Sequence, residues 1–327
     1  MRAVVTGGAG FIGSTIVDAL VAGGSEVLVI DDLSRGSRTN LTDALARGAR
    51  LTELDIRDGP AVDEAFRSFR PELVFHLAAQ IDVRVSMDEP ARDAAVNLIG
   101  SVNVFSAAHR AGVRRVVNTS TGGAIYGATE LVPTSEAVPA DPISPYGLSK
   151  LSTERYARWF RRMRGLDVVT LRYGNVYGPR QDPRGDAGVI AIFCQRVLTG
   201  RRPTIYGDGT QTRDYVFVED IAAANLAAAC HAAPAYDEYN IGTGTEVSVV
   251  ELAAAVASAA GADPVGFRPE FAPARAGELQ RSCLDITRAR DDLALPPVTP
   301  LANGLVRTLT WVATLAGSAL PVPGQPG

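Results

Sequence analysis

Short apolar runs alternate with helix-like segments through the first half of this chain. Each run holds four or five residues with few polar side chains, and the segments between runs repeat apolar residues at helical spacing. Apolar strands separated by helices are typical of a parallel sheet that helices cover on both sides. We predict strands at Ala3–Thr6, Val27–Ile30, Leu51–Leu54, Leu73–Leu77, Arg115–Asn118 and Val168–Leu171, and helices at about Phe11–Ala22, Ala61–Ser68, Ala91–Ala111 and Tyr146–Met163.

The pattern changes after about Asn175. Pro and Gly interrupt the sequence from Gly178 to Gly188, and shorter elements follow. Here we predict a strand at Pro203–Tyr206 and helices at Val189–Thr199, Val218–His231, Val249–Ala260 and Ile286–Leu293.

The predicted fold class is therefore α/β, a doubly wound parallel sheet of the Rossmann type with a smaller C-terminal α/β substrate domain. We assign residues 1–175, with later segments near 215–245, to a nucleotide-binding domain and residues 176–316 to a substrate-binding region. Residues 317–327 hold three prolines and three glycines, and we expect them to form a flexible tail.

The composition is that of a globular enzyme. Of the 327 residues, 46% are apolar, enough for a sizeable core, and the net charge of −4 argues against a protein that follows a nucleic-acid backbone. The chain opens on a strand-like run and lacks a long apolar stretch, so we expect neither a signal peptide nor a membrane span. Three widely spaced cysteines, Cys194, Cys230 and Cys283, form neither a disulfide framework nor a metal pattern. We expect a cytoplasmic protein with no metal, nucleic-acid or membrane partner.

Three glycines follow the first predicted strand and open the first predicted helix: Gly7, Gly10 and Gly13. Glycine permits a tight turn and lets the backbone approach a pyrophosphate, which the amides at a helix N-terminus then bind. With the strand, the helix and a downstream acid, the pattern indicates a dinucleotide site, in the spacing GxxGxxG rather than GxGxxG.

Acidic and polar residues at the ends of the next strands extend this site. Asp31, with Asp32 behind it, ends the second strand, where a carboxylate binds the ribose hydroxyls and repels a 2′-phosphate. This favours NAD over NADP, although Arg35 and Arg38 nearby could attract that phosphate. Further cofactor contacts are predicted at Asp55, Ile56, Leu77, Ala78, Ala79 and Gln80.

Tyr146 and Lys150 lie four residues apart where a helix is predicted, so their side chains share one helix face. A free tyrosine has a pKa of about 10 and is a poor base at neutral pH. A nearby cation stabilises the phenolate, and the pair is then able to take a proton from a substrate hydroxyl and return it.

These residues resemble the extended short-chain dehydrogenase/reductases, and within them the NAD-dependent sugar-nucleotide epimerase/dehydratase family. The resemblance covers residues 1 to about 313, and jointly its motifs are highly specific although each alone is weak. They are the Gly7–Gly13 loop with Phe11 and Ile12, Asp31, His76–Gln80, Asn97, Ser120-Thr121, Tyr146 with Lys150, Arg172–Pro179 with Tyr173, Arg213–Val216 and Arg275–Glu278.

The family's mechanism implies a role for each central residue. Tyr146, as a phenolate, removes the proton of the sugar 4-hydroxyl while the C4 hydride passes to NAD. Lys150 lowers the pKa of Tyr146 and binds the nicotinamide ribose. Thr121 or Ser120 bonds the 4-oxygen. Counting from the strand favours Thr121, in a run one residue longer than the commonest family pattern. Asn97 and Tyr173 are also implied to contact the cofactor.

The resemblance also places the substrate. Arg213 and Arg275 match two arginines that clamp the diphosphate, because a planar guanidinium binds phosphate oxygens bidentately. Asn175 matches a side chain that binds a phosphate or sugar oxygen. The remaining substrate contacts are expected from Val189 and Tyr206 at the uracil and from Glu278 beside the second arginine.

Gly122-Gly123 indicates the type of reaction. Related dehydratases carry an Asp-Glu pair there and decarboxylases a Glu, whereas glycine cannot move a proton. We therefore expect an isomerase, an NAD-dependent 4-epimerase that interconverts UDP-glucose and UDP-galactose through a 4-keto intermediate. The alternatives are a UDP-glucuronate 4-epimerase or another nucleotide-sugar oxidoreductase, and, from a different class, a non-catalytic NAD-binding regulator. Such regulators commonly lose the Tyr or the Lys, and both are present.

Ser282 lies seven residues after Arg275, where the family carries either Tyr or a small residue. A small side chain leaves room for a 2-acetamido group, so UDP-GlcNAc and UDP-GalNAc are expected as further substrates. The family also implies a homodimer, formed by the helices Ala91–Ala111 and Tyr146–Met163.

Overall fold

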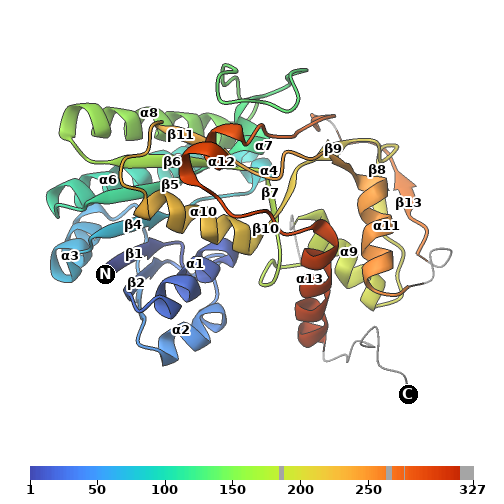
Figure 1. Ribbon diagram of the computed structural model, residues 1–327, viewed down its shortest axis with the longest axis horizontal. Coiled ribbons are helices and arrows are strands. Elements are labelled where there is room, and N and C mark those ends of the chain that lie inside the picture. Colours follow the sequence, from blue (N-terminus) through green and yellow to red (C-terminus); the bar gives the residue numbers. More distant parts are fainter. Residues whose placement is uncertain (184–187, 263–266, 276, 317–327) are drawn as a thin grey trace.

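A seven-stranded parallel sheet forms the middle layer of the larger part of the protein (Figure 1). The computed structural model describes residues 1–183, 188–262, 267–275 and 277–316. The strands of the sheet are β1 (Arg2–Thr6), β2 (Glu26–Asp31), β3 (Arg50–Glu53), β4 (Leu73–His76), β5 (Arg115–Thr121), β6 (Val168–Tyr173) and β11 (Glu238–Ile241). They lie in the order β11-β6-β5-β4-β1-β2-β3, which reverses between β1 and β4. Open α/β sheets bind ligands at such a switch point, beyond the carboxyl ends of the strands.

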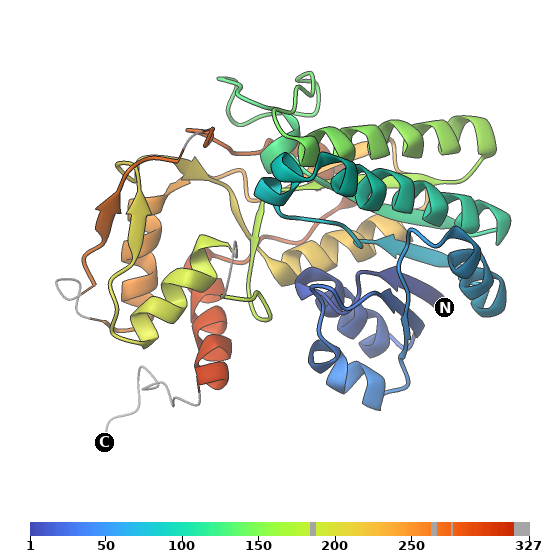
Figure 2. The same ribbon diagram turned by 180° about the vertical axis from the view of Figure 1, so that it is seen from behind.

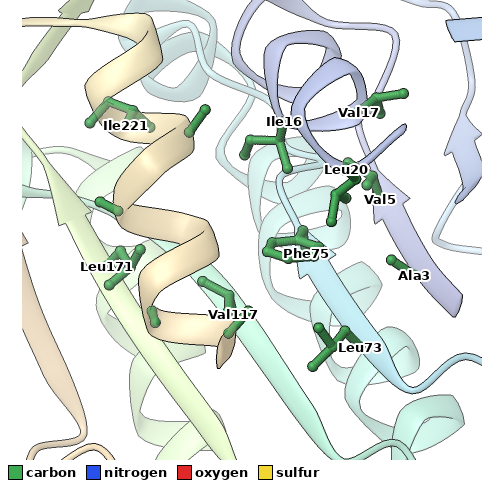
Figure 3. Close-up of a cluster of buried hydrophobic side chains, with 14 of the residues drawn as sticks. Ala3, Val5, Ile16, Val17, Leu20, Leu73, Phe75, Val117, Leu171 and Ile221 are labelled. Atoms are coloured by element: carbon green, nitrogen blue, oxygen red, sulfur yellow. The ribbon is translucent and has the colours of Figure 1, made fainter. Parts of the chain in front are cut away.

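Helices cover both faces of the sheet, as predicted (Figures 1 and 2). One face packs against α1 (Phe11–Ala22), α2 (Thr42–Ala46) and α10 (Val218–Cys230), and the other against α3 (Gly59–Phe69), α6 (Ser101–Arg110) and α8 (Pro145–Arg164). Successive strand residues point to opposite faces, so Val5 joins the first cluster and Val4 the second. In Figure 3, Ile16 of α1 and Ile221 of α10 share one cluster with strand residues such as Phe75 and Leu171.

The C-terminal elements form a smaller body beside the sheet (Figure 1). Its apolar cluster joins α9 (Val189–Leu198), α11 (Val249–Ala259) and α13 (Leu301–Ala316). The parallel pair β8 (Thr204–Tyr206) and β13 (Glu270–Ala272) borders it. Short pairs link the two parts: β7 (Asn175–Tyr177) with β10 (Tyr215–Phe217), and β9 (Thr212–Arg213) with β12 (Val247–Ser248). The remaining elements are η1 (Arg38–Leu41), α4 (Val83–Asp88), α5 (Pro90–Ala94), the π-helical η2 (Ala95–Gly100), α7 (Gly122–Ile125) and α12 (Thr287–Leu293).

The predicted strands and helices are all present, with ends that shift by a few residues. The predicted helix Ala91–Ala111 consists of α5, η2 and α6 in succession. The predicted tail, residues 317–327, lies outside the described residues. In the part of the chain that the structure describes, no helix is both long and apolar enough to cross a membrane.

Several short elements were absent from the prediction, and so were the longer helix α13 and the sheet strand β11. β11 has no apolar run because Asn240 lies in its middle, yet this side chain is buried and its polar atoms are bonded. Its Nδ2 donates to the Thr134 carbonyl (2.9 Å), and its Oδ1 accepts from the Tyr126 hydroxyl (2.7 Å). In α13, Gly304 reads as a helix breaker, but an added Cβ would lie 2.1 Å from the Tyr177 hydroxyl, so glycine allows a close approach.

Candidate active site

The glycine loop between β1 and α1 packs tightly against the loop that follows β4. Gly7 has a φ of +68°, and an added Cβ would lie 2.6 Å from the backbone nitrogen of Ala78. A Cβ at Gly13 would lie 2.2 Å from the Gly7 carbonyl oxygen. Side chains are therefore excluded here, and the predicted residues Leu77 and Ala78 lie beside the glycine loop.

The N-terminus of α1 suits an anionic ligand. Gly10 is the N-cap residue and supplies no side-chain hydrogen bond, and the first turn carries no acidic residue. The first amides of a helix lack intrahelical partners and lie at the positive end of its dipole. The side chains of Phe11 and Ile12 pack against the apolar cluster of the C-terminal body, which leaves the backbone to face a ligand. This loop fits the pyrophosphate of NAD.

Asp31 connects the glycine loop with the end of β2. Its Oδ2 accepts from the Ala9 amide and its Oδ1 from the Leu33 amide, each at 2.9 Å. Burial raises the pKa of this carboxyl, and the two amides act in the opposite direction. Each carboxylate oxygen keeps a second lone pair for a hydroxyl donor. The residue is therefore suited to bind ribose hydroxyls.

The neighbouring charged residues have partners of their own. Arg35, a candidate for a 2′-phosphate, pairs with Asp82 at 3.3 Å. Asp32 accepts from the Ser34 amide (3.0 Å) and hydroxyl. The Arg57 guanidinium holds the pKa of Asp55 below its usual range, and Ile56 behind it is buried. Asp55 and Ile56 stay predicted cofactor contacts.

Asn97 holds the loop after β4 in place. Its Oδ1 accepts from the Gln80 amide (2.8 Å) and its Nδ2 donates to the Gln80 carbonyl (2.9 Å). The same Nδ2 donates to Asp93 Oδ1 at 2.9 Å. The structure therefore gives Asn97 a positioning role for the Leu77–Gln80 segment, which includes Ala79. A direct contact of Asn97 with the cofactor stays a prediction.

Tyr146 lies in the first turn of α8. Ser144 caps this helix by accepting from the Gly147 amide (3.2 Å), and Pro145 occupies its first position. Burial raises the pKa of Tyr146 to about 12, the charge of Asp93 adds to the increase, and a hydrogen bond with the Thr121 side chain opposes it. In the chain alone this pKa thus moves opposite to the direction that the resemblance implies.

Lys150 is buried one turn further along α8, and its Nζ donates to the Thr119 carbonyl at 3.1 Å. Burial lowers its pKa to about 8, against the charges of Asp93 and Glu154. The ammonium also disfavours a positive charge on buried His76, whose pKa burial lowers to about 3. At neutral pH the site therefore holds one ammonium and a neutral imidazole.

The two candidate hydroxyls differ in their surroundings. The side chain of Thr121 hydrogen-bonds Tyr146, whereas Ser120 Oγ is buried and has no partner in the described chain. They alternate along β5 and so point to opposite faces of the sheet. This geometry favours Thr121. Tyr173 is buried, and its hydroxyl is bonded to Thr119 (3.2 Å) and Asn225 (2.7 Å). Its contact with the cofactor stays a prediction.

Five of the predicted substrate residues lie around β8 and β9, namely Tyr206, Arg213, Arg275, Glu278 and Ser282. Arg213 donates to Glu278 Oε1 (3.1 Å), and the Arg275 guanidinium lies 4.0 Å from the centre of the Tyr206 ring. The Ser282 amide donates to the Thr212 carbonyl (3.2 Å), so Ser282 lies beside the strand that holds Arg213. Ala276, between the second arginine and Glu278, lies outside the described residues.

Gly122 and Gly123 begin α7, directly after Thr121. A Cβ at Gly122 would meet the Leu284 side chain at 2.5 Å, whereas one at Gly123 would lie 3.7 Å from Asn175 Oδ1. A side chain at position 123 would therefore extend toward a predicted substrate residue. Val189 starts α9 and packs partly against the C-terminal apolar cluster. Its contact with the uracil stays a prediction.

Comparison with known proteins agrees with this geometry. The model of the NAD dependent epimerase/dehydratase family matches residues 3–242. The chain belongs to this family. A UDP-glucose 4-epimerase of Mycolicibacterium smegmatis is 47% identical over 312 residues, which span 95% of this chain and 98% of that protein.

Two solved structures of this family superpose over nearly the whole chain. A Thermotoga maritima UDP-glucose 4-epimerase with UDP-glucose has a TM-score of 0.91 and 44% identity, covering 97% of this chain and 100% of the other. A Thermus thermophilus UDP-glucose 4-epimerase in complex with NAD has a TM-score of 0.87 and 43% identity, covering 95% and 99%.

Sequence reasoning missed the buried acid Asp93, and it quoted Asp214 within the Arg213–Val216 motif without giving it a role. Asp214 accepts from the amides of Thr243 (2.7 Å), Gly244 (3.2 Å) and Leu284 (3.3 Å), and so ties the strand after Arg213 to two loops. Asp93 contacts Gln80 and Asn97. Its spacing of four residues from Asn97 within a predicted helix was the available signal.

Proposed function

We propose that this protein is an NAD-dependent 4-epimerase that interconverts UDP-glucose and UDP-galactose through a 4-keto intermediate. The observation that carries the proposal is the hydrogen bond between Tyr146 and Thr121 directly before Gly122-Gly123. It supplies one proton-transfer group and its partner, with no second acid or base in the two positions that follow. Epimerisation at C4 needs only one group that takes and returns the hydroxyl proton, whereas elimination needs a further acid or base.

In this proposal Tyr146, Thr121 and Lys150 together move the proton of the sugar 4-hydroxyl. NAD, when bound, supplies the hydride acceptor. Tyr146 takes the proton of the sugar 4-hydroxyl and returns it to the same oxygen. Thr121 orients that oxygen and the phenol. Lys150 keeps a positive charge beside them, and the N-terminus of α8 also favours the phenolate. Residues 1–175, with the segment near 215–245, would bind NAD.

The rest of residues 176–316 would bind the UDP-hexose. Arg213 and Arg275 would hold the diphosphate, and Arg213 would exchange or share its present partner Glu278. Tyr206, under the Arg275 guanidinium, would lie beside the uracil. Asn175 would bind a sugar or phosphate oxygen near Gly123. The relative whose structure holds UDP-glucose supports this substrate class.

Incubation of the purified protein with UDP-galactose tests the proposal. We expect UDP-glucose to accumulate without added NAD, because hydride returns to the sugar in each turnover. Conversion of UDP-glucuronate but not of UDP-galactose would instead support the alternative substrate. A protein that binds NAD yet converts no nucleotide sugar would be a regulator.

Replacement of Ser282 by Tyr tests the acetamido substrates. Ser282 is small and lies beside β9, so a phenol there would occupy space that a 2-acetamido group needs. We expect UDP-GlcNAc turnover to fall at least about tenfold while UDP-galactose turnover stays within about twofold, since one steric clash costs about 1–3 kcal/mol. Both activities are measured on one preparation. Equal loss of both would contradict the specificity role.

A homodimer through α8 is the expected assembly. Leu148, Tyr156, Trp159 and Met163 are exposed and lie on one face of this helix, and Ile99 of η2 is exposed as well. A second copy of this chain would cover them. Replacing Leu148 and Met163 by Glu should shift the mass in solution from dimer to monomer. A wild-type protein that is already monomeric would refute the assembly.

The three cysteines are unpaired, which supports a reducing, cytoplasmic setting.

A further inference from the structure

Asp93 is a fully buried carboxylate that the mechanism above does not use. It lies in α5, which packs against α8, the helix that carries Tyr146 and Lys150. Burying a charge is costly unless hydrogen bonds or opposite charges compensate it. A carboxylate at this buried position therefore needs partners that compensate its charge.

The two oxygens of Asp93 have different surroundings. Oδ1 accepts from Gln80 Nε2 (3.0 Å) and from Asn97 Nδ2 (2.9 Å). Oδ2 is buried and has no hydrogen-bond partner within the described residues. Oδ1 thus fixes the loop after β4. Oδ2 accepts no hydrogen bond, so no donor compensates the negative charge on this side of the carboxylate.

The charge of Asp93 acts on both reactive groups of α8. It raises the pKa of Tyr146 and the pKa of Lys150. Glu154, on the same helix, acts on Lys150 too, but it is neutralised by Arg172 of β6 at 2.6 Å. His76 of β4 stays neutral. Asp93 is therefore the acid that acts on both members of the pair.

We propose that Asp93 is a positioning residue of this reaction, which fixes the cofactor-side loop through Gln80 and Asn97 and keeps a negative charge beside Tyr146 and Lys150. Two consequences follow. Lys150 stays protonated although it is buried, and Tyr146 resists ionisation until a positive charge arrives with oxidised NAD. The inference rests on the proposed function, but its first test needs no substrate.

The test is the titration of Tyr146 in the NAD-loaded protein without substrate. The phenolate absorbance is obtained by subtracting the Tyr146→Phe spectrum from that of wild type, and the same subtraction is made in an Asp93→Asn background. Asn keeps the shape and an acceptor oxygen and removes the charge. We expect Tyr146 to ionise about one pH unit lower in the Asp93→Asn background, because a nearby like charge is removed.

The pH profile of kcat provides a second readout. Removing the charge lowers the pKa of Tyr146 and of Lys150, so both limbs of the profile should move to lower pH. Asp88→Asn, an exposed acid at the end of α4, is the matched control and should leave both limbs in place. A purely structural Asp93 would reduce kcat and leave the limbs and the titration unchanged, which would overturn the proposal.

Gln80→Leu tests the other half of the proposal and remains available if Asp93→Asn does not fold. It removes one donor to Asp93 and leaves the charge intact. We expect NAD affinity to fall about tenfold, the usual effect of losing one hydrogen bond to a charged group, with Tyr146 titrating as in wild type. Asp93→Leu lacks the acceptor for Gln80 and Asn97 and is not itself a predicted cofactor contact, so it should lower NAD affinity as well. Wild-type NAD affinity in Asp93→Leu would overturn the positioning role. If the protein showed no epimerase activity, the Tyr146 titration and the NAD affinity could still be measured. Failure of the proposed function is therefore distinguishable from failure of the role proposed for Asp93.

Discussion

Tyr146→Phe lowers kcat by about 10²–10⁴-fold, the usual contribution of a positioned acid–base group. The ring keeps its packing in the first turn of α8, while the hydroxyl that bonds Thr121 and exchanges the substrate proton is lost. The conversion of UDP-galactose to UDP-glucose measures this effect. NAD released on denaturation should equal the wild-type amount, because none of the glycine-loop contacts changes.

Tyr156→Phe is the matched control for this variant. Tyr156 lies on the same helix but on its outer face, away from Thr121 and Lys150, so loss of its hydroxyl should leave kcat within about twofold. If Tyr146→Phe kept more than a tenth of the wild-type kcat, another group would have to be the base, and the assignment of Tyr146 would be withdrawn.

Gly13→Ala abolishes NAD binding and destabilises the protein. The new Cβ would lie 2.2 Å from the Gly7 carbonyl oxygen and 2.8 Å from the Gly8 Cα, and backbone atoms cannot move aside as a flexible side chain does. Inside a helix, Gly→Ala usually stabilises by about 1 kcal/mol. Here we expect the free energy of unfolding to fall by about 1–3 kcal/mol, because overpacking outweighs the gain in propensity. Denaturant unfolding and NAD content measure the two effects.

Gly23→Ala, at the other end of α1, is the control. Gly23 has a φ of −79°, and an added Cβ would meet nothing closer than 3.5 Å. It should be neutral or stabilise by about 0.4–1 kcal/mol. Wild-type NAD content in Gly13→Ala would show that the loop tolerates a side chain and that the tight approach to the pyrophosphate is not needed.

Arg172 is a motif residue whose structural role cannot be read from the sequence. The sequence marks it as part of a family motif, whereas the structure shows a buried guanidinium held bidentately by Glu154 at 2.9 and 2.6 Å. The same group donates to the Tyr126 hydroxyl at 2.8 Å. This network links β6 to α8 and to the segment after α7. Arg172 therefore helps to hold α8, the helix that carries Tyr146 and Lys150, in place.

Local chemistry in the sequence determined most of the sheet, the helices that cover it and the glycine loop. Apolar runs, helical spacing and the Gly7–Gly13 pattern are properties of neighbouring residues, so they can be read without knowing what packs against them. The spacing of Tyr146 and Lys150 placed both side chains on one helix face for the same reason.

Only the tertiary structure decided the features that depend on contacts between distant segments. β11 pairs with β6, and its buried Asn240 side chain bonds Tyr126 and Thr134, both more than a hundred residues away. β5 turns Thr121 rather than Ser120 toward Tyr146. Asp93 acquires its influence on Tyr146 because α5 packs against α8, and burial amplifies a charge that would be screened at the surface. Sequence patterns report neither burial nor these partners, and burial and partners together set the protonation chemistry of the site.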